Sequence, residues 1–177
     1  MITEVELSVV VVAVTRFQDG YCDKCSPDHQ SVTFEINGIS RSCANQLVRH
    51  RMASYSQESM RYVDMSNLPV VIPPSLAEDG REAMLQLHAA ASETYRRLRA
   101  TGVRKEDARL VLGLGVATRI VVTMQLHWLK RFWKLRHDRA AQWEIRALAD
   151  KMLLAASEYF PDYFRRETNE LLGINKL

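Results

Sequence analysis

The chain has 177 residues, of which 47% are hydrophobic and 25% charged, and this composition is typical of one globular domain over residues 1–177. The formal net charge of +3 is too small to indicate nucleic-acid binding by itself, although converging arginines would favour an anionic ligand. Three cysteines are too few for a disulfide scaffold, so we expect a reduced, cytoplasmic protein.

The N-terminal part of the chain predicts two strands and a helix. Residues 5–16 form a β-branched apolar run that is too short to cross a bilayer and lacks a preceding basic region, so we expect a buried strand. Residues 31–37 alternate and predict a second strand, which Asn37-Gly38 would end in a turn. Ser40 can then cap a helix that runs to about residue 50 or 52.

The middle of the chain changes from extended to helical. Residues 54–74 lack helical period and contain three prolines, which predicts a loop with room for a short strand at Val70 to Ile72. Ser75 and Glu78 have the spacing of a capping box, so a long helix should follow up to about Ala100, with Gly102 closing it.

The remainder reads as helices. A short helix is expected at 105–112, a long one at about 117–137, another at about 139–158, and a helical tail after Pro161. The steps of four from Ile120 to Met124, Trp128 and Phe132 predict the second of these helices. A small N-terminal sheet followed mostly by helices indicates an α+β fold.

The segment from Gln46 to Arg61 is unusual in its charges. The basic triplet Arg49-His50-Arg51 ends the expected helix, and the polar loop after it carries few charges besides Glu58 and Arg61. Arginine suits phosphate because its planar fork donates two parallel hydrogen bonds. From the pattern alone, a solvated basic helix end is the better interpretation.

The order of these residues favours a sharper interpretation. Arg49-His50-Arg51, seven further residues and then Ser59 form the R-H-R-x7-S signature, and in this the chain resembles the flavin-dependent thymidylate synthases. The resemblance covers about residues 29–159 and implies a small antiparallel sheet with long helices. Further stretches agree in order: Thr33 to Ile36, Gly38 to Arg41, Gln46 to Val48, Arg61-Tyr62, Ile72 to Pro74, Ala108 to Leu112 and Leu135 to Ile145.

The resemblance also implies the site residues. The uridylate contacts it implies come from Gln46, Arg49, Gln57, Glu58, Ser59, Met60, Arg61, Arg109 and Arg136. The FAD contacts it implies come from Ser26, Arg49, His50, Arg51, Gln57, Gln125, His127 and Arg131. The catalytic assignments are Ser59 and Arg136, of which Arg136 should stabilise charge that develops on the uracil carbonyl oxygens.

The implied reaction carries a one-carbon unit from 5,10-methylenetetrahydrofolate to C5 of a uridine monophosphate. FAD is the implied cofactor, and NADPH the implied reductant of the flavin. The family implies a homotetramer whose active sites draw on several subunits, with no nucleic-acid or membrane partner. The substrate would be dUMP, while a UMP-methylating relative from nucleoside-antibiotic biosynthesis has nearly equal standing.

Two side chains, Ser59 and Cys43, are of a type that can act as a nucleophile in a covalent mechanism. A serine nucleophile needs an adjacent base, and nothing in the sequence places His50 beside Ser59, so we expect Ser59 to position the pyrimidine by hydrogen bonds. Cys43 falls at helical spacing with Leu47, which is typical of a small buried core residue. Cys22, Cys25 and His29 hint at zinc, but a second ligand pair is not evident, so we expect no metal.

The chain departs from the family pattern in three places. Ser26 to His29 matches only the end of the family's G-H-x-S/T-P-x-E-H motif. The family's N-x-R-S-x-x-N pattern is replaced by Gln125, His127 and Arg131 at the matching positions, and all three can hydrogen-bond. In the family's S-H-A-Q stretch, Arg139 and Ala140 replace serine and histidine.

These departures keep two other classes open. One is a non-catalytic protein that binds flavin or nucleotide and retains the residues that bind phosphate. The other is a basic nucleic-acid-binding module, motivated by Lys130-Arg131, Lys134 and Arg136 on one segment, although Trp128, Phe132 and Trp133 among them are better explained as core or subunit interface.

Overall fold

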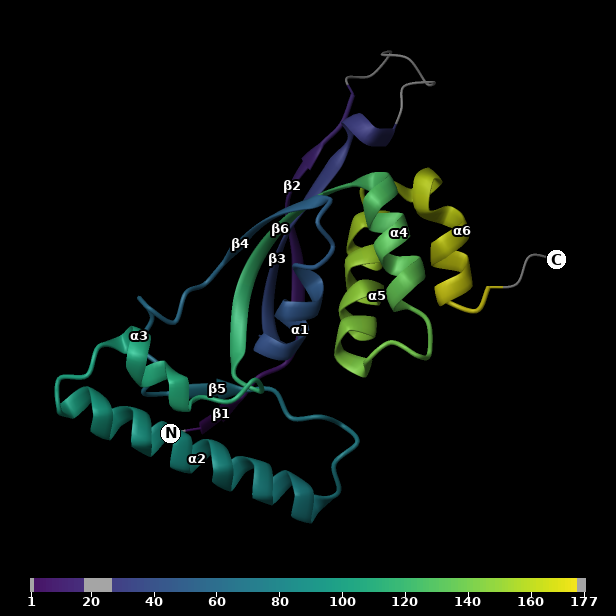
Figure 1. Ribbon diagram of the computed structural model, residues 1–177. Helices are drawn as coiled ribbons and strands as arrows, with labels where there is room; N and C mark the ends of the chain where they lie inside the picture. The colour runs from purple at the N-terminus through teal and green to yellow at the C-terminus, as the bar shows by residue number, and fades with distance from the viewer. Residues whose placement is uncertain (1, 18–26, 175–177) are drawn as a thin grey trace. The chain divides into compact units, whose positions relative to one another are not determined.

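The computed structural model describes residues 2–17 and 27–174 and shows a mixed α+β fold, as expected (Figure 1). The elements follow in this order: β1 (Ile2–Glu4), β2 (Ser8–Thr15), η1 (Pro27–His29), β3 (Ser31–Ser40), α1 (Arg41–Leu47), β4 (Ala53–Gln57), β5 (Leu68–Val70), α2 (Glu78–Ala100), α3 (Lys105–Ala108), η2 (Arg109–Val111), β6 (Ala117–Gln125), α4 (Leu126–Arg136), α5 (Trp143–Ser157) and α6 (Pro161–Leu171).

The main sheet has four strands in the order β2-β3-β6-β4. The hydroxyl oxygens of Thr33 and Thr123 lie 2.9 Å apart, and the backbone N–H of Arg41 donates to the carbonyl of Val116. From Thr33 in β3 to Arg41 just after it, the facing residues run backwards from Thr123 in β6 to Val116 just before it, so β3 and β6 are antiparallel.

The described residues divide into two compact units. Unit 1 holds the described residues up to Leu7, Asn37–Asn45 and Gln57–Arg119, and unit 2 holds the described residues of Ser8–Ile36, Gln46–Ser56 and those from Ile120 onward. The expectation of one domain stays a prediction.

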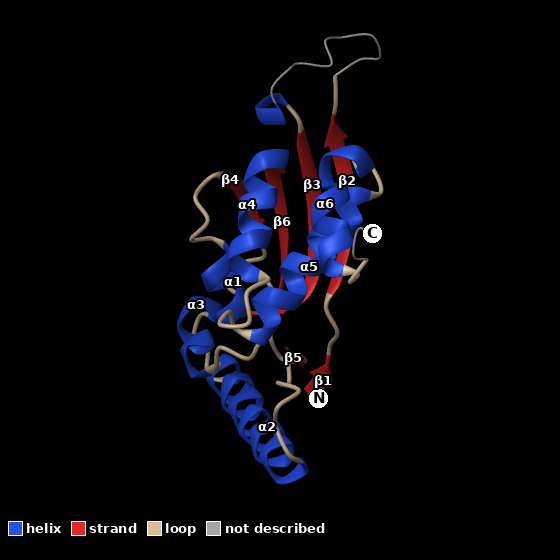
Figure 2. Ribbon diagram, turned by 90° about the vertical axis from the view of Figure 1, so that its right-hand side faces the viewer, coloured by secondary structure: helices blue, strands red, loops and turns tan. Residues whose placement is uncertain are grey.

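In unit 2, helices cover one face of the sheet. Alternate β3 side chains Val32, Phe34 and Ile36 are fully buried, as the period of a strand requires. Helices α4, α5 and α6 lie on one side of the strands (Figures 1 and 2). On α5 the buried residues fall at helical spacing: Ile145, Leu148, Ala149, Met152, Leu153 and Ala156.

Unit 1 is built around α2 and the parallel pair β1 and β5. In that pair Ile2 lies opposite Leu68. Helix α2 buries His88, Ser92 and Tyr95 at steps of four and three, and Gly102 follows it with a φ of 87°, so the predicted helix and its closing glycine are confirmed. The core of unit 1 is formed by Met65, Leu68, Val70, Tyr95, Ala108 and Val116.

The long helix predicted at 117–137 is wrong in its first half. Ala117–Gln125 is strand β6, and the helix starts only at Leu126. The steps of four that joined Ile120 to Met124 also fit a strand, because both lie two residues from the buried Val122 on the same sheet face. The β-branched run from Thr118 to Thr123 favours the strand, and neighbouring strand β3 completes its hydrogen bonds.

Two predictions about β3 and α1 also need correction. Asn37-Gly38 is no turn, because β3 continues to Ser40, and Gly38 adopts a φ of 75° within the strand. Ser40 does cap α1, since its Oγ accepts the backbone N–H of Cys43 at 3.0 Å. The helix ends at Leu47, so the triplet that begins at Arg49 follows the helix instead of ending it.

The buried strand predicted at residues 5–16 is wrong in its burial, because the side chains of β2 (Ser8–Thr15) are partly buried or exposed and none is fully buried. The remaining corrections concern the ends of elements. Strand β4 begins at Ala53 and occupies the first residues of the loop predicted at 54–74, and β5 begins at Leu68, two residues before the suggested strand. The cap of α2 is Ala77, without a side-chain hydrogen bond, so the capping box is wrong. Helix α5 begins at Trp143 because the Gln142 side chain accepts the backbone N–H groups of Glu144 and Ile145. Among the described helices, none is long and apolar enough to cross a membrane.

A buried carboxylate connects α6 to α4. Glu167 is 2% exposed, and its carboxylate lies 3.2 Å from Nζ of Lys130 and 3.8 Å from Nζ of Lys134. We expect Glu167→Ala to lower the free energy of unfolding by about 2 kcal/mol, because both ammonium groups lose their partner while remaining partly solvated. Urea denaturation measures this change. Exposed Glu170→Ala on the same helix is the control, and equal losses in both variants would contradict the assignment.

Candidate functional site

A hollow of about 270 Å³ opens in unit 2 beside α4. It is lined by His50, Arg51, Met52, Met124, Trp128, Arg131, Phe132 and Leu135. Most of these side chains are apolar or aromatic, and the charged ones are arginines. An apolar hollow with a few polar groups at its wall is the usual form of a small-molecule site.

His50, which lines this hollow, contacts Arg136, a residue 86 positions away in sequence. Nε of Arg136 donates to Nε2 of His50 at 2.9 Å, and the His50 ring packs edge-on against Phe132 with centroids 4.8 Å apart. Burial, and then the charge of Arg136, lower the pKa of His50 below its ordinary value. His50 is therefore neutral at pH 7, with its proton on Nδ1, and can accept from Arg136.

Tyr55 fixes the backbone that presents His50. Its single hydroxyl proton is shared between the carbonyl oxygens of His50, at 2.6 Å, and of Leu47, at 3.0 Å. Burial raises the pKa of Tyr55 to about 12, so the hydroxyl keeps its proton at physiological pH. The turn between α1 and β4 is thereby held in one conformation.

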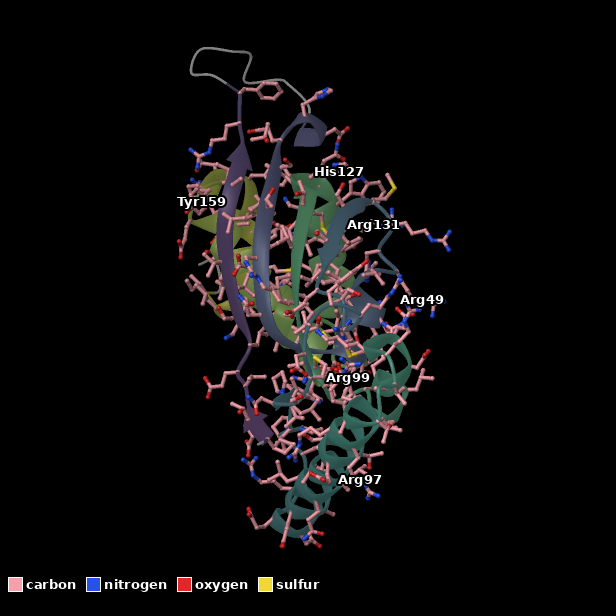
Figure 3. The ribbon with its side chains drawn as sticks, turned by 90° about the vertical axis from the view of Figure 1, so that its left-hand side faces the viewer. Arg49, Arg97, Arg99, His127, Arg131 and Tyr159 are labelled. Carbon is pink, nitrogen blue, oxygen red and sulfur yellow. The ribbon has the colours of Figure 1, made fainter. Side chains whose placement is uncertain are left out.

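The start of α4 supplies a second group of side chains to unit 2. Nδ1 of His127 lies 2.6 Å from Oδ1 of Asp28, and the guanidinium of Arg131 lies 5.5 Å from the centroid of the Trp128 ring. Gln125 is exposed at the end of β6. In Figure 3, His127, Arg131 and Arg49 lie along the same edge of unit 2.

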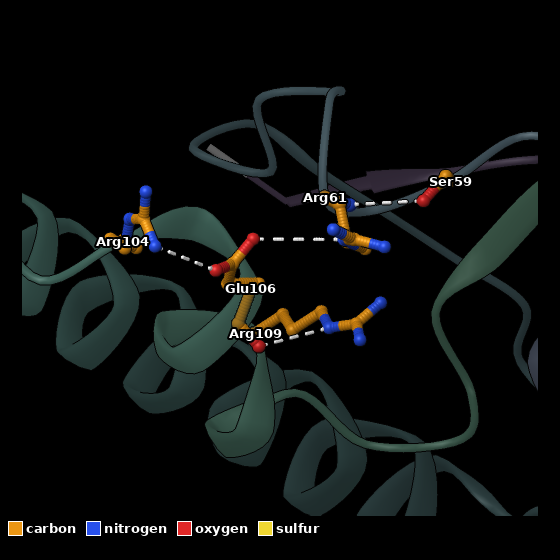
Figure 4. Close-up of polar contacts among 5 residues, drawn as sticks. All are labelled: Ser59, Arg61, Arg104, Glu106 and Arg109. Carbon is orange, nitrogen blue, oxygen red and sulfur yellow. Dashed lines mark hydrogen bonds and ion pairs between the residues drawn. The ribbon is translucent and has the colours of Figure 1, made fainter.

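Unit 1 gathers a separate cationic cluster around Glu106 (Figure 4). The Glu106 carboxylate lies 3.6 Å from Nε of Arg61 and 3.3 Å from Nη1 of Arg104, and its carbonyl accepts Nε of Arg109 at 3.1 Å. Oγ of Ser59 accepts the backbone N–H of Arg61 at 3.3 Å. The structure thus brings together three predicted nucleotide contacts, Ser59, Arg61 and Arg109.

Sequence reasoning missed Arg41, which belongs to the same unit. Its Nη2 donates to the carbonyl of Glu58 at 3.1 Å, while its Nε is buried with no hydrogen-bond partner in the described chain. Burial lowers the pKa of Arg41, the nearby Glu58 raises it, and the charge of Arg109 lowers it again. The sequence did offer one signal for Arg41, because the stretch Gly38 to Arg41 agrees with the family pattern, but that agreement implies no role for the residue.

The other predicted residues are spread along the two units. Gln57 approaches the hydroxyl of Thr118 with its amide nitrogen at 3.5 Å, and the backbone N–H of Glu58 donates to the carbonyl of Arg119 at 3.0 Å. Gln46 and Met60 are partly exposed, Arg49 and Arg51 are exposed, and Ser26 lies outside the described residues. All roles toward substrate or cofactor stay predictions.

Metal binding and polynucleotide binding find little support in the described residues. No group of three histidine, cysteine or acidic side chains in that part of the chain could hold a metal, and Cys22 and Cys25 lie outside it. Cys43 is fully buried in unit 1, as predicted. Lys130 and Lys134 pair with Glu167, and Phe132 and Trp133 are core residues, so this helix is not a free basic face.

An apolar hollow with arginines at its wall, and a second arginine cluster in unit 1, are typical of a protein that binds small anionic ligands. The sequence model of the family described as thymidylate synthase complementing protein, Thy1, matches residues 26–162, and the chain belongs to this family.

Similar proteins are named flavin-dependent thymidylate synthases. The flavin-dependent thymidylate synthase of Geobacter sulfurreducens is 46% identical over 142 residues, which cover 78% of this chain and 61% of that protein. The protein of the same name from Pyrococcus abyssi is 45% identical over 141 residues, covering 76% of this chain and 57% of that protein. The chain therefore spans less than two thirds of the length of these relatives.

A solved structure shares the fold. The UMP/dUMP methylase PolB from Streptomyces cacaoi, bound with 5-Br dUMP, matches with a TM-score of 0.77 and 19% sequence identity. The match covers 93% of this chain and 97% of that one, so it extends over both units. This likeness confirms the expected fold class.

Proposed function

We propose that the chain catalyses flavin-dependent C5-methylation of a uridine monophosphate, with dUMP as substrate and dTMP as product. Membership of the Thy1 family and the names of its relatives support this proposal. The observation that carries it is the bond from Arg136 to neutral His50, which joins the matched stretch Leu135 to Ile145 to the R-H-R triplet beside the hollow. One-carbon transfer from 5,10-methylenetetrahydrofolate and reduction of the flavin by NADPH belong to the same proposal.

The residues around the hollow fit one planar ring of a flavin dinucleotide and its pyrophosphate. The hollow offers apolar walls for a planar ring, while Arg51 and Arg131 supply the charge that a pyrophosphate needs. When bound, FAD would supply a hydride to the transferred carbon. Arg49, His50, Arg51, Gln125, His127 and Arg131 would hold it, with Ser26 and Gln57 as further predicted contacts.

The unit 1 cluster fits the nucleotide. Arg61 and Arg109 carry guanidinium groups that can donate to a phosphate, and Arg41 has a buried donor that lacks an acceptor in the described chain. Ser59 would hold the pyrimidine, together with Gln46, Gln57, Glu58 and Met60. Arg136 would stabilise charge on the uracil carbonyl oxygens.

Assembly into a homotetramer is part of the proposal. Active sites would form between subunits, so that the nucleotide residues of unit 1 and the flavin residues of unit 2 need not come from one chain. A cytoplasmic location is expected for an enzyme of nucleotide synthesis. Light scattering of the purified protein measures the mass of the assembly, and a monomer would contradict this part.

The direct test is an assay of the purified protein with FAD, NADPH and 5,10-methylenetetrahydrofolate. Supplying dUMP and UMP in parallel measures activity and sugar preference together. A methylated product, with flavin absorbance in the protein, is the expected result. PolB is named for both nucleotides, so preference for UMP would place the chain with the second candidate function, UMP methylation in nucleoside-antibiotic biosynthesis. Binding of flavin and nucleotide without product would identify a non-catalytic relative.

Ser59→Ala tests whether this serine positions or attacks the pyrimidine. We expect kcat/KM to fall by about tenfold, because one neutral hydrogen bond to the substrate is lost. A loss beyond 10⁴-fold would indicate a nucleophile instead. Exposed Ser54→Ala on β4 is the matched control and should retain full activity.

A further inference from the structure

Two side chains of α4 depart in chemistry from the family's N-x-R-S-x-x-N pattern. With Gln125 at its first position, the pattern places Trp128 where the family has serine and Arg131 where it has the last asparagine. A hydroxyl and an amide hold a ligand by directed hydrogen bonds. An indole and a guanidinium act by stacking and by charge, so the segment presents a different surface.

The structure holds this indole at the hollow. Trp128 is half-buried on α4 and lines the hollow, and the ring of His127 lies 4.6 Å from it with a tilt of 50°. The guanidinium of Arg131 lies 5.5 Å from the indole centroid. Nδ1 of His127, the ring beside the indole, lies 2.6 Å from Oδ1 of Asp28.

The size of the hollow limits what it can accept. Its volume of about 270 Å³ is just below the ~300–1,000 Å³ of drug-sized ligand pockets. One planar ring system therefore fits, and a whole dinucleotide does not. The other walls are the apolar side chains of Met52, Met124, Phe132 and Leu135, which suit the faces and edges of such a ring.

We propose that Trp128 and Arg131 form this chain's own cofactor contact: the indole stacks on a planar ring of FAD, and the guanidinium binds its phosphates. The proposal rests on the proposed function, since it takes FAD as the ligand. Stacking on Trp128 replaces the hydrogen bonds that the family pattern provides at these positions. The ring is the isoalloxazine or the adenine, which share this planar chemistry.

Dissociation constants of FAD for the full-length protein and its variants test the contact. Trp128→Ser, which restores the family residue, should weaken FAD binding by about 5-fold to about 150-fold, the range of one lost stacking contact. Trp128→Phe keeps a planar ring and should recover most of the affinity. Trp143→Phe changes a tryptophan that does not line the hollow and should leave FAD binding unchanged.

Shorter ligands assign the ring and the phosphate contact. If Trp128→Ser weakens FMN but not ADP, the isoalloxazine stacks on the indole, and the reverse result assigns the adenine. With the isoalloxazine on Trp128, bound flavin is non-fluorescent in the wild type and regains emission in Trp128→Ser, because indole in contact with flavin quenches it. Arg131→Gln should weaken FAD, FMN and ADP about tenfold and leave riboflavin unaffected.

If the Trp128→Ser variant binds FAD, FMN and ADP as tightly as the wild-type protein does, this inference is wrong, and the proposed function still stands. Failure of the wild-type protein to bind any flavin would instead overturn the proposed function itself. Circular dichroism of each variant excludes loss of fold, and Trp128→Phe provides the same comparison at nearly unchanged volume.

Discussion

Replacing Arg136 by alanine is expected to lower kcat by about 10²–10³-fold, the usual effect of removing one preorganised donor from developing negative charge. In the proposed reaction the Arg136 guanidinium faces the uracil carbonyl oxygens, and its Nε is already held by His50 at 2.9 Å. This bond orients the side chain before substrate arrives, so the donor needs little reorganisation. Steady-state kinetics with saturating uridylate measure the effect.

The control for this prediction is Arg139→Ala. Arg139 is exposed three residues further along, and its contribution to the described contacts is a backbone carbonyl that accepts from Arg146. The two variants lose the same charge, so they separate a local role from a change in net charge. Near-UV circular dichroism should show an intact fold in both. Turnover of Arg136→Ala at the wild-type level would show that the residue does not contact the reacting ring.

Gly38→Ala is expected to cost about 3 kcal/mol or more of unfolding free energy, the largest stability effect we predict. Gly38 has a φ of 75°, which an L side chain rarely adopts. A Cβ at this position would lie 2.1 Å from the carbonyl oxygen of Glu6 and 2.8 Å from its carbon. Both are backbone atoms, so the two chain segments must separate to admit the methyl group.

Gly102→Ala provides a matched control. Gly102 has a similar φ of 87°, but a Cβ there would meet nothing within 4 Å. That variant should lose only about 1 kcal/mol, from the backbone conformation alone. The difference between the two urea midpoints therefore measures the clash with Glu6. If both variants lose the same unfolding free energy, the close approach of Gly38 to the Glu6 backbone does not contribute to the cost.

The family and most helices could be predicted from the sequence because their signals are local. The R-H-R-x7-S signature lies within eleven consecutive residues, and the matched stretches follow it in order along the chain. Helices α2 and α6 were predicted because a helix is set largely by neighbours three and four residues apart. The serine cap of α1 at Ser40 is equally local.

What the tertiary structure alone decided involves partners far apart in sequence. Ala117–Gln125 became a strand because β3 and β4 lie on either side of it, and a period of four in Ile120 and Met124 could not reveal those neighbours. The Arg136–His50 bond joins residues 86 positions apart, and the burial of Arg41 Nε, which has no partner among residues 2–17 and 27–174, depends on what surrounds it. Sequence thus determined the kind of chemistry, while packing decided which side chains meet, because contacts between distant segments leave no periodic signal in either of them.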